Sequence, residues 1–245
     1  MLVSILTCTW NSEKTIKDCC LSISQQTYGN IEHIVIDNLS TDNTINILKK
    51  IAKEDKNLKI IINARNFGCI RSPFYGLLQA KGDAEIFLNS DFQDPPELIP
   101  NYIENWEKGH KITLGQKTKT KEIIFMKYLK RIYYRTLNLI SSVNLPLYTT
   151  GSGIYDQKII EQLRQIKDPY PYLRGLVAEF EDEINLIQFE EPKRLGGRTK
   201  SNFFTYYDYV ILGLVKHSSM PLRLIIFLGF VSSLLSFVSA LIYLF

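Results

Sequence analysis

Cysteine and histidine are scarce in this chain of 245 residues, which has four of the first and three of the second. The cysteines do not have the spacing of zinc ligands, and we interpret them as packing residues. Internal repeats and low-complexity segments are also missing. The sequence therefore indicates neither a zinc module nor a repeat architecture, and its composition is that of an ordinary globular domain.

An export signal is not recognisable either. Residues 1–6 form too short an apolar run for a signal peptide and lead directly into strand-like sequence. The net charge of +4 is modest, but its distribution is uneven. Residues 117–135 hold seven basic residues against one acidic residue, Glu122. This segment indicates a phosphate-rich partner or an anionic lipid surface.

Charged residues are missing from residues 224–245, a run long enough to cross the hydrocarbon core of a bilayer. We interpret residues 221–245 as a transmembrane segment, with a buried core helix as the alternative. Lys216 and Arg223 precede the run, and positive flanks favour the cytoplasmic side. We therefore expect the large N-terminal part on the cytoplasmic face of the inner (cell) membrane, anchored by the C-terminal helix.

Apolar, strand-like runs alternate with helical patterns along the first half of the chain. The expected strands are residues 2–8, 31–36, 58–62 and 84–88, and the expected helices are residues 14–26, 40–54, 70–80 and 98–107. Such alternation is typical of an α/β fold with a doubly wound, mostly parallel sheet. Ligands of these sheets bind beyond the carboxyl ends of the strands, where Asp37 and Asp91 are found.

An amphipathic pattern marks the second half of the chain. Apolar residues recur at helical spacing within residues 121–141, while Lys127, Arg131 and Arg135 stand four residues apart on another face. A solvated surface helix and a helix at a membrane interface both fit this pattern. The other expected elements are a strand at 111–114, a loop at 145–153, a helix at 156–165, a helix or strand at 173–180, a strand at 183–190, a basic glycine-bearing loop at 193–200 and a helix at 203–215.

Oxygen-bearing side chains gather directly after the fourth expected strand. If the chain stays extended there, Asn89, Asp91 and Gln93 project from one side. Their oxygens suit a hard divalent cation such as Mg²⁺ or Mn²⁺. The alternative is a capped loop, in which Asp94 is the N-cap of a following helix. Both interpretations can hold together.

Five motifs, taken in order, resemble those of the polyprenyl-phosphate glycosyltransferases, which include dolichol-phosphate mannosyltransferases and undecaprenyl-phosphate glucosyltransferases of glycosyltransferase family two. The motifs are Asp37 with the polar residues after it, residues 65–68, residues 82–83, residues 91–97 and residues 194–200. The most specific is the string Asp-Phe-Gln-Asp-Pro-Pro-Glu at 91–97, joined to the late basic loop. The resemblance covers nearly the whole chain and implies the GT-A fold, a mostly parallel sheet with flanking helices.

The resemblance also implies a role for each matched residue. Asp91 and Gln93, with Asn89 beside them, are expected to hold Mg²⁺ or Mn²⁺ against the donor diphosphate. The residues expected to bind the nucleotide sugar are Thr9, Asn11, Asp37, Asn66, Gly68 and Ser90. The expected catalytic residues are Asp91, Arg194 and Lys200, and those at the acceptor phosphate are Arg131, Arg135 and Arg198.

By the same resemblance, residues 1–202 form a cytoplasmic catalytic domain that includes the amphipathic helix, residues 203–220 a juxtamembrane helix and residues 221–245 the membrane anchor. The implied reaction is an inverting transfer of a sugar from a UDP- or GDP-sugar to a polyprenyl phosphate, which yields a lipid-linked sugar for cell-envelope glycans or glycoconjugates. No nucleic-acid partner is implied, and a homo-oligomer is left open.

The chain departs from the family at Asn38 and Asn89, where aspartate is common. Asparagine still offers a carbonyl oxygen to a hard cation, but the site loses a negative charge at each position. Two alternatives stay open, the second of them prompted by these two asparagines. One is a glycosyltransferase of the same family with a glycan or lipid hydroxyl as acceptor, and the other is a non-catalytic nucleotide-sugar-binding membrane protein.

Overall fold

The computed structural model describes residues 1–119, 124–140, 146, 148–180, 183–192 and 203–244. The chain divides into two compact units, Met1–Glu122 with Pro146–Lys200, and Ile123–Leu145 with Ser201–Phe245. The helix expected at 121–141 therefore groups with the C-terminal helices. This division differs from the expected catalytic domain of residues 1–202, which included that helix.

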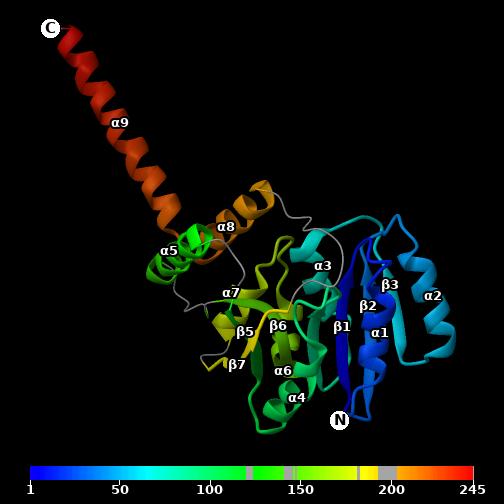
Figure 1. The fold of residues 1–245 in the computed structure, drawn as a ribbon. Coiled ribbons are helices and arrows are strands. Elements are labelled where there is room, and N and C mark those ends of the chain that lie inside the picture. The colour runs from blue at the N-terminus through cyan, green and yellow to red at the C-terminus, as the bar shows by residue number, and fades with distance from the viewer. Residues whose placement is uncertain (120–123, 141–145, 147, 181–182, 193–202, 245) are drawn as a thin grey trace. The chain divides into compact units, whose positions relative to one another are not determined.

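The first unit is built on a seven-stranded sheet with the strand order β3-β2-β1-β4-β6-β5-β7 (Figure 1). Its strands are β1 Val3–Thr9, β2 Ile31–Asp37, β3 Leu58–Ile62, β4 Ala84–Asn89, β5 Ile112–Lys119, β6 Thr149–Asp156 and β7 Asn185–Glu190. Only the pairings of β6 with β4 and with β5 are antiparallel among these described strands. The expected doubly wound, mostly parallel sheet is confirmed.

Helices cover both faces of this sheet, as the apolar clusters show. One face packs against α1 Ile16–Ser24, α2 Thr44–Glu54 and α4 Ile99–Glu107, and the other against α3 Gly68–Leu77, α6 Gln157–Gln165 and α7 Leu173–Phe180. The central strands are buried on both faces, which explains why their sequences are continuous apolar runs. The segment at 173–180, for which helix and strand were both expected, is helical.

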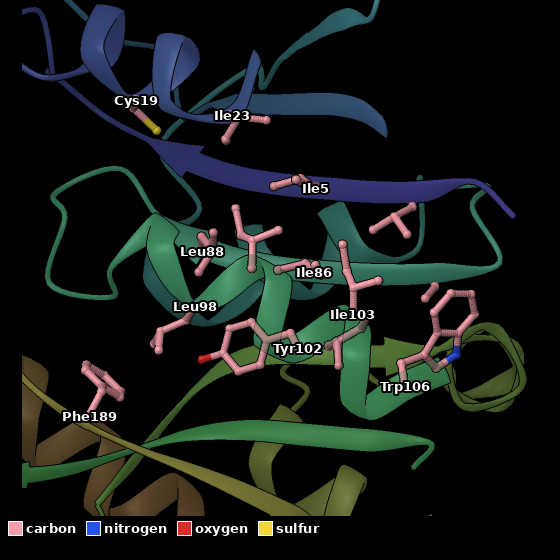
Figure 2. Close-up of a cluster of buried hydrophobic side chains, with 14 residues drawn as sticks. Ile5, Cys19, Ile23, Ile86, Leu88, Leu98, Tyr102, Ile103, Trp106 and Phe189 are labelled. Carbon is pink, nitrogen blue, oxygen red and sulfur yellow. The ribbon is translucent and has the colours of Figure 1, made fainter. Parts of the chain in front are cut away.

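Figure 2 shows the cluster on the first face, in which the side chains of the central strands are enclosed by two helices. The strand residues Ile5, Ile86 and Leu88 lie between Cys19 and Ile23 of α1 and Tyr102, Ile103 and Trp106 of α4. Buried apolar residues in α1 recur three and four positions apart, as expected of a helix with one face on a sheet. This packing holds the carboxyl ends of β1 and β4 next to each other.

The prediction of a loop at 145–153 is wrong, because β6 begins at Thr149 and pairs with β4 and β5. Gly153 explains both why a loop was predicted and why a strand forms. A Cβ atom at Gly153 would lie 2.2 Å from the carbonyl oxygen of Thr113, so only glycine fits between the neighbouring strands. From sequence alone, the same Gly-Ser-Gly run is typical of a turn.

The second unit contains three helices in the described part of the chain: α5 Ile124–Ile140, α8 Phe203–His217 and α9 Met220–Leu244. The hydroxyl of Tyr133 donates to the carbonyl oxygen of Val210 at 3.4 Å, and Ser218 Oγ donates to the carbonyl oxygen of Ile140 at 2.9 Å. These bonds join α5 to α8 and to the turn before α9. α9 has 25 residues, a mean hydropathy of 2.4 over 18 residues and no buried residue, so its length and composition suffice to cross a membrane.

Candidate active site

The carboxyl ends of β1, β2 and β4 meet at one edge of the sheet. Thr9 is paired in register with Asp37, and Cys8 with Asn89. Four of the six residues expected to bind the donor stand at these strand ends or in the loops that follow them: Thr9, Asn11, Asp37 and Ser90. At this edge Thr9 is 3% exposed, and its buried hydroxyl has no hydrogen-bond partner among the described residues. A buried polar atom of this kind is typical of a ligand site.

Asp37 is fully buried and organises the loop after β2. Its carboxylate accepts two hydrogen bonds from Ser40, one from the backbone nitrogen at 2.7 Å and one from Oγ at 2.5 Å. Ser40 Oγ in turn accepts from the backbone nitrogen of Asn11 at 2.8 Å. Asn11 has a φ of 51°, in the left-handed region that asparagine tolerates better than most residues. Asp37 and Asn11 are thus brought together as expected, through a serine that the sequence analysis did not single out.

Asn38 supports the backbone of the next loop. Its side-chain oxygen accepts from Asn63 Nδ2 at 2.9 Å and from the backbone nitrogen of Phe67 at 3.3 Å. The side-chain oxygen of Asn66 accepts from the backbone nitrogen of Gly68 at 2.8 Å, where φ is +77°. Asn66 and Gly68, both expected at the nucleotide sugar, therefore shape the turn that begins α3.

A cationic and aromatic cluster that sequence analysis missed lies at the same turn. The guanidinium of Arg71 is 5.0 Å from the ring centroid of Phe67 and 4.9 Å from that of Tyr170, and the guanidinium of Arg65 is 4.8 Å from the Phe67 ring. Cation–π contacts of this kind join the start of α3 to the loop before α7. The sequence does show Arg65 and Arg71 on either side of Phe67. Tyr170, however, is distant in sequence, and no local pattern links it to them.

The acidic segment after β4 is turned and not extended. β4 ends at Asn89, and Phe92 has a φ of 59°. The prediction that Asn89, Asp91 and Gln93 project from one side of an extended strand end is therefore wrong about the backbone, because a left-handed residue in the middle breaks the alternation. Asp91 remains partly exposed in this turn, and Ser90 is buried.

Asp94 does not cap a helix, so the alternative of a capped loop is also wrong in its detail. The short helix that follows, Pro96–Leu98, has Pro95 at its N-cap and no side-chain cap. Asp94 is 1% exposed, and its Oδ2 accepts from Asn89 Nδ2 at 2.6 Å and from Ser152 Oγ at 2.7 Å. The carboxylate joins the acidic segment to β6.

Gln93 is held by a second carboxylate, from the end of β7. Its Nε2 donates to Glu191 Oε1 at 2.6 Å, and Lys117 Nζ donates to the same oxygen at 2.8 Å. The side chains of this ion pair are only 14% and 16% exposed. Neither Lys117 nor Glu191 was singled out from the sequence.

The oxygen atoms of this loop fit a divalent cation that is bound partly by the protein and partly by a diphosphate. No group of three or more histidine, cysteine, aspartate or glutamate residues that could hold a metal is found in the described ranges. What this loop offers is one carboxylate, Asp91, with the amide oxygens of Asn89 and Gln93. Mg²⁺ and related ions are commonly bound by one or two carboxylates together with substrate phosphates, which matches this set.

Five expected site residues fall outside the described part of the first unit. Arg194, Arg198 and Lys200 lie outside the described residues, and Arg131 and Arg135 are exposed residues of α5, in the other unit. His33 is buried beside Thr7, 3.0 Å from its hydroxyl, and burial lowers the pKa of its imidazole to about 3. The described part of this edge thus carries Thr9, Asp37, Asn89, Ser90 and Asp91.

Comparison with known proteins agrees with this geometry. The model of the family "Glycosyl transferase family 2" matches residues 4–164. The uncharacterized glycosyltransferase YkcC of Bacillus subtilis is 30% identical over 234 residues, which cover 94% of this chain and 72% of that protein. The bactoprenol glucosyl transferase of Shigella phage SfV is 24% identical over 208 residues, covering 84% of this chain and 68% of that protein.

The fold is also similar to that of a solved structure. Glucosyl-3-phosphoglycerate synthase from Mycobacterium tuberculosis, in complex with Mn²⁺, UDP and phosphoglyceric acid, superposes with a TM-score of 0.60 at 18% identity, over 86% of this chain and 75% of that one. The sheet and its helices therefore have the GT-A arrangement. With the family model matching well over half of its residues, the chain belongs to glycosyl transferase family 2.

Proposed function

We propose that this chain transfers a sugar from a uridine diphosphate sugar to a polyprenyl phosphate at the cytoplasmic surface of a membrane. One observation carries the proposal: the Asp37 loop and the Asp91 loop meet at one sheet edge, in a chain whose α9 is apolar and unburied. The bactoprenol glucosyl transferase of phage SfV supports the lipid acceptor, and the UDP and Mn²⁺ bound by the mycobacterial synthase support the donor and a divalent cation.

The donor end of the site uses the residues described above. Asp37 and Ser40 hold the loop that would contact the base and ribose, and the unpartnered Thr9 hydroxyl offers one more hydrogen bond. Asp91, with the amide oxygens of Asn89 and Gln93, would hold Mg²⁺ or Mn²⁺. When bound, such a cation neutralises the charge that grows on the leaving diphosphate.

The acceptor explains why a base is not needed. A phosphate monoester is already ionised near neutral pH, so it needs orientation more than deprotonation. We assign this orientation to Arg131, Arg135 and Arg198, and charge neutralisation at the two phosphates to Arg194 and Lys200. Attack opposite the departing diphosphate inverts the anomeric configuration.

The second unit supplies the membrane contact in this proposal. α9 would anchor the chain, and Lys216 and Arg223 near its start favour a cytoplasmic active site. α5 exposes Arg131 and Arg135 together with apolar side chains, among them Tyr128 at 66% and Leu139 at 85% exposure. A helix with both kinds of exposed side chain can lie at a lipid surface, where the acceptor phosphate is found.

A donor screen tests the proposal. The full chain in detergent or vesicles is given short-chain polyprenyl phosphate, Mn²⁺ and a panel of UDP- and GDP-sugars, and lipid-linked sugar is measured by mass spectrometry. We expect a product with a UDP-sugar and none with the Asp91→Ala variant. Transfer to a hydroxyl acceptor in place of the lipid phosphate, or no transfer from any donor, would falsify the proposal.

A further inference from the structure

We infer that Glu191 is a positioning residue of the metal site, which it serves by fixing the orientation of the Gln93 side-chain amide. The inference rests on the proposed function, in which Asp91 and Gln93 hold a divalent cation. Glu191 Oε1 accepts from Gln93 Nε2 at 2.6 Å and from Lys117 Nζ at 2.8 Å. Glu191 itself is not proposed as a ligand.

The argument starts from the two different ends of an amide. The amide of Gln93 has a nitrogen that only donates and a carbonyl oxygen that only accepts, whereas an ionised carboxylate only accepts. Glu191 can therefore bind the nitrogen end of Gln93 and repels the carbonyl end. The carbonyl oxygen, which is the end that a hard cation binds, is kept off the carboxylate.

Lys117 keeps Glu191 in this role. The two side chains are largely shielded from water, at 14% and 16% exposure, so their mutual attraction is stronger than that of a surface pair. Lys117 thereby fixes the position of the Glu191 carboxyl group through its own hydrogen bond to Oε1. β5 and β7 pair in parallel with Lys117 opposite Phe189, two residues before Glu191, which brings the lysine to the end of β7.

The same arrangement recurs on the other side of Asp91. Asn89 presents its side-chain nitrogen to Asp94, a buried carboxylate, at 2.6 Å. Each of the two amides beside Asp91 is thus oriented by a carboxylate that binds its nitrogen. A loop with a single candidate carboxylate ligand gains two amides of defined orientation in this way.

The test is the affinity for Mn²⁺ in the presence of UDP, measured by electron paramagnetic resonance on the full chain in detergent. Glu191→Gln keeps the shape but can bind Gln93 by either amide end, and we expect Mn²⁺ to bind about ten-fold more weakly. UDP affinity without metal and the melting temperature are expected to stay unchanged. The matched control is Glu104→Gln, which breaks the exposed Lys108–Glu104 pair of 2.6 Å on α4 and leaves Mn²⁺ affinity as it is.

A double-mutant cycle shows whether Glu191 acts through Gln93. In a Gln93→Ala background, Glu191→Gln is expected to cause no further loss of Mn²⁺ affinity. A further loss of equal size in the Gln93→Ala background would overturn the inference. A lower melting temperature of Glu191→Gln would also overturn it, because the loss of Mn²⁺ affinity would then come from a weakened fold. Unchanged Mn²⁺ affinity in Glu191→Gln overturns the inference alone, whereas a wild-type chain that binds no Mn²⁺ with UDP overturns it together with the proposed metal site.

Discussion

Asn89 donates its side-chain nitrogen to the buried carboxylate of Asp94 at 2.6 Å, and Ser152 donates to the same oxygen. This pair explains how the site accommodates asparagine at a position where the family resemblance implies aspartate. An aspartate at 89 would place two carboxylates at hydrogen-bond distance, and one of them would have to bind a proton. In this chain the Asn89 amide donates a hydrogen bond to Asp94 instead.

Asn89→Asp is therefore expected to destabilise the fold above neutral pH. The new carboxylate pair raises one folded-state pKa, so stability is present at low pH and is lost as the pH rises through that pKa. We expect a loss of about 1–3 kcal/mol at pH 8 and a smaller loss at pH 5, from denaturant melts without metal. Asn89→Ala is the control, since it removes the bond without adding charge. Equal losses at the two pH values for Asn89→Asp would contradict the explanation.

Asp91→Asn is expected to reduce metal-dependent turnover more than Asn89→Ala does. Asp91 is the one carboxylate that the loop offers to a cation, whereas Asn89 contributes an amide oxygen. Because a bound metal stabilises the transition state by several kcal/mol, we expect a loss of about 100-fold or more for Asp91→Asn. Steady-state kinetics over a Mn²⁺ titration measures both variants. Comparable losses would count against the assignment.

Asp37→Asn is expected to weaken nucleotide binding. The substitution places an NH₂ group against Ser40 and removes one of the hydrogen bonds that the buried Asp37 side chain accepts. A hydrogen bond contributes about 0.5–1.5 kcal/mol, so UDP affinity should fall about 2- to 10-fold by calorimetry. Ser40→Ala, which removes only the hydroxyl, should cause a smaller loss. A UDP affinity equal to that of the wild type in Asp37→Asn would show that this loop does not contact the nucleotide.

Glu85→Gln is expected to stabilise the fold at alkaline pH. Burial raises the pKa of the Glu85 carboxyl from 4.5 to about 8, and the Arg164 guanidinium at 3.6 Å only partly opposes it. Because the folded-state pKa is the higher one, this group contributes stability that is lost as pH rises from about 4.5 to about 8.

The measurement for this prediction is the melting temperature between pH 5 and pH 9. The wild-type value should fall across this range, and Glu85→Gln should flatten the fall. Glu104→Gln, at an exposed site on α4, should retain the wild-type slope. A slope that persists in Glu85→Gln would assign the pH dependence to another group.

Removal of α9 is expected to release the chain from neutral lipid vesicles, as sedimentation with vesicles measures. The truncated chain should still bind anionic vesicles through α5, where Arg131 and Arg135 are exposed. A basic residue near such a surface contributes about 1 kcal/mol, so Arg131→Ala with Arg135→Ala should weaken this binding about 30-fold. Neutral-vesicle binding that survives truncation would show that α9 is not the anchor.

Much of the fold could be predicted because local patterns of apolar and polar residues indicate most of its strands and helices. The apolar runs of β1, β2 and β4 and the periodic helices between them led directly to a parallel sheet with ligands at its carboxyl edge. Asp37 and Asp91 were expected at that edge in the same way, since each follows such a run, whereas Thr9 was expected from the family resemblance. The errors fall where local signals conflict with tertiary demands: β6 looks like a turn because Gly153 must fit against Thr113, and Phe92 bends a segment whose alternation predicted an extended chain.

The sequence by itself determined the alternation of strands and helices in the first half of the chain, the family and the strand ends that carry the proposed donor site, because all three depend on the spacing of residue types along the chain. Only the tertiary structure decided which partners orient those residues. Gln93 and Glu191 are 98 positions apart, and Asn89 and Ser152 are 63 apart. Such pairs depend on which strands become neighbours in the sheet, and local sequence patterns do not indicate this strand order.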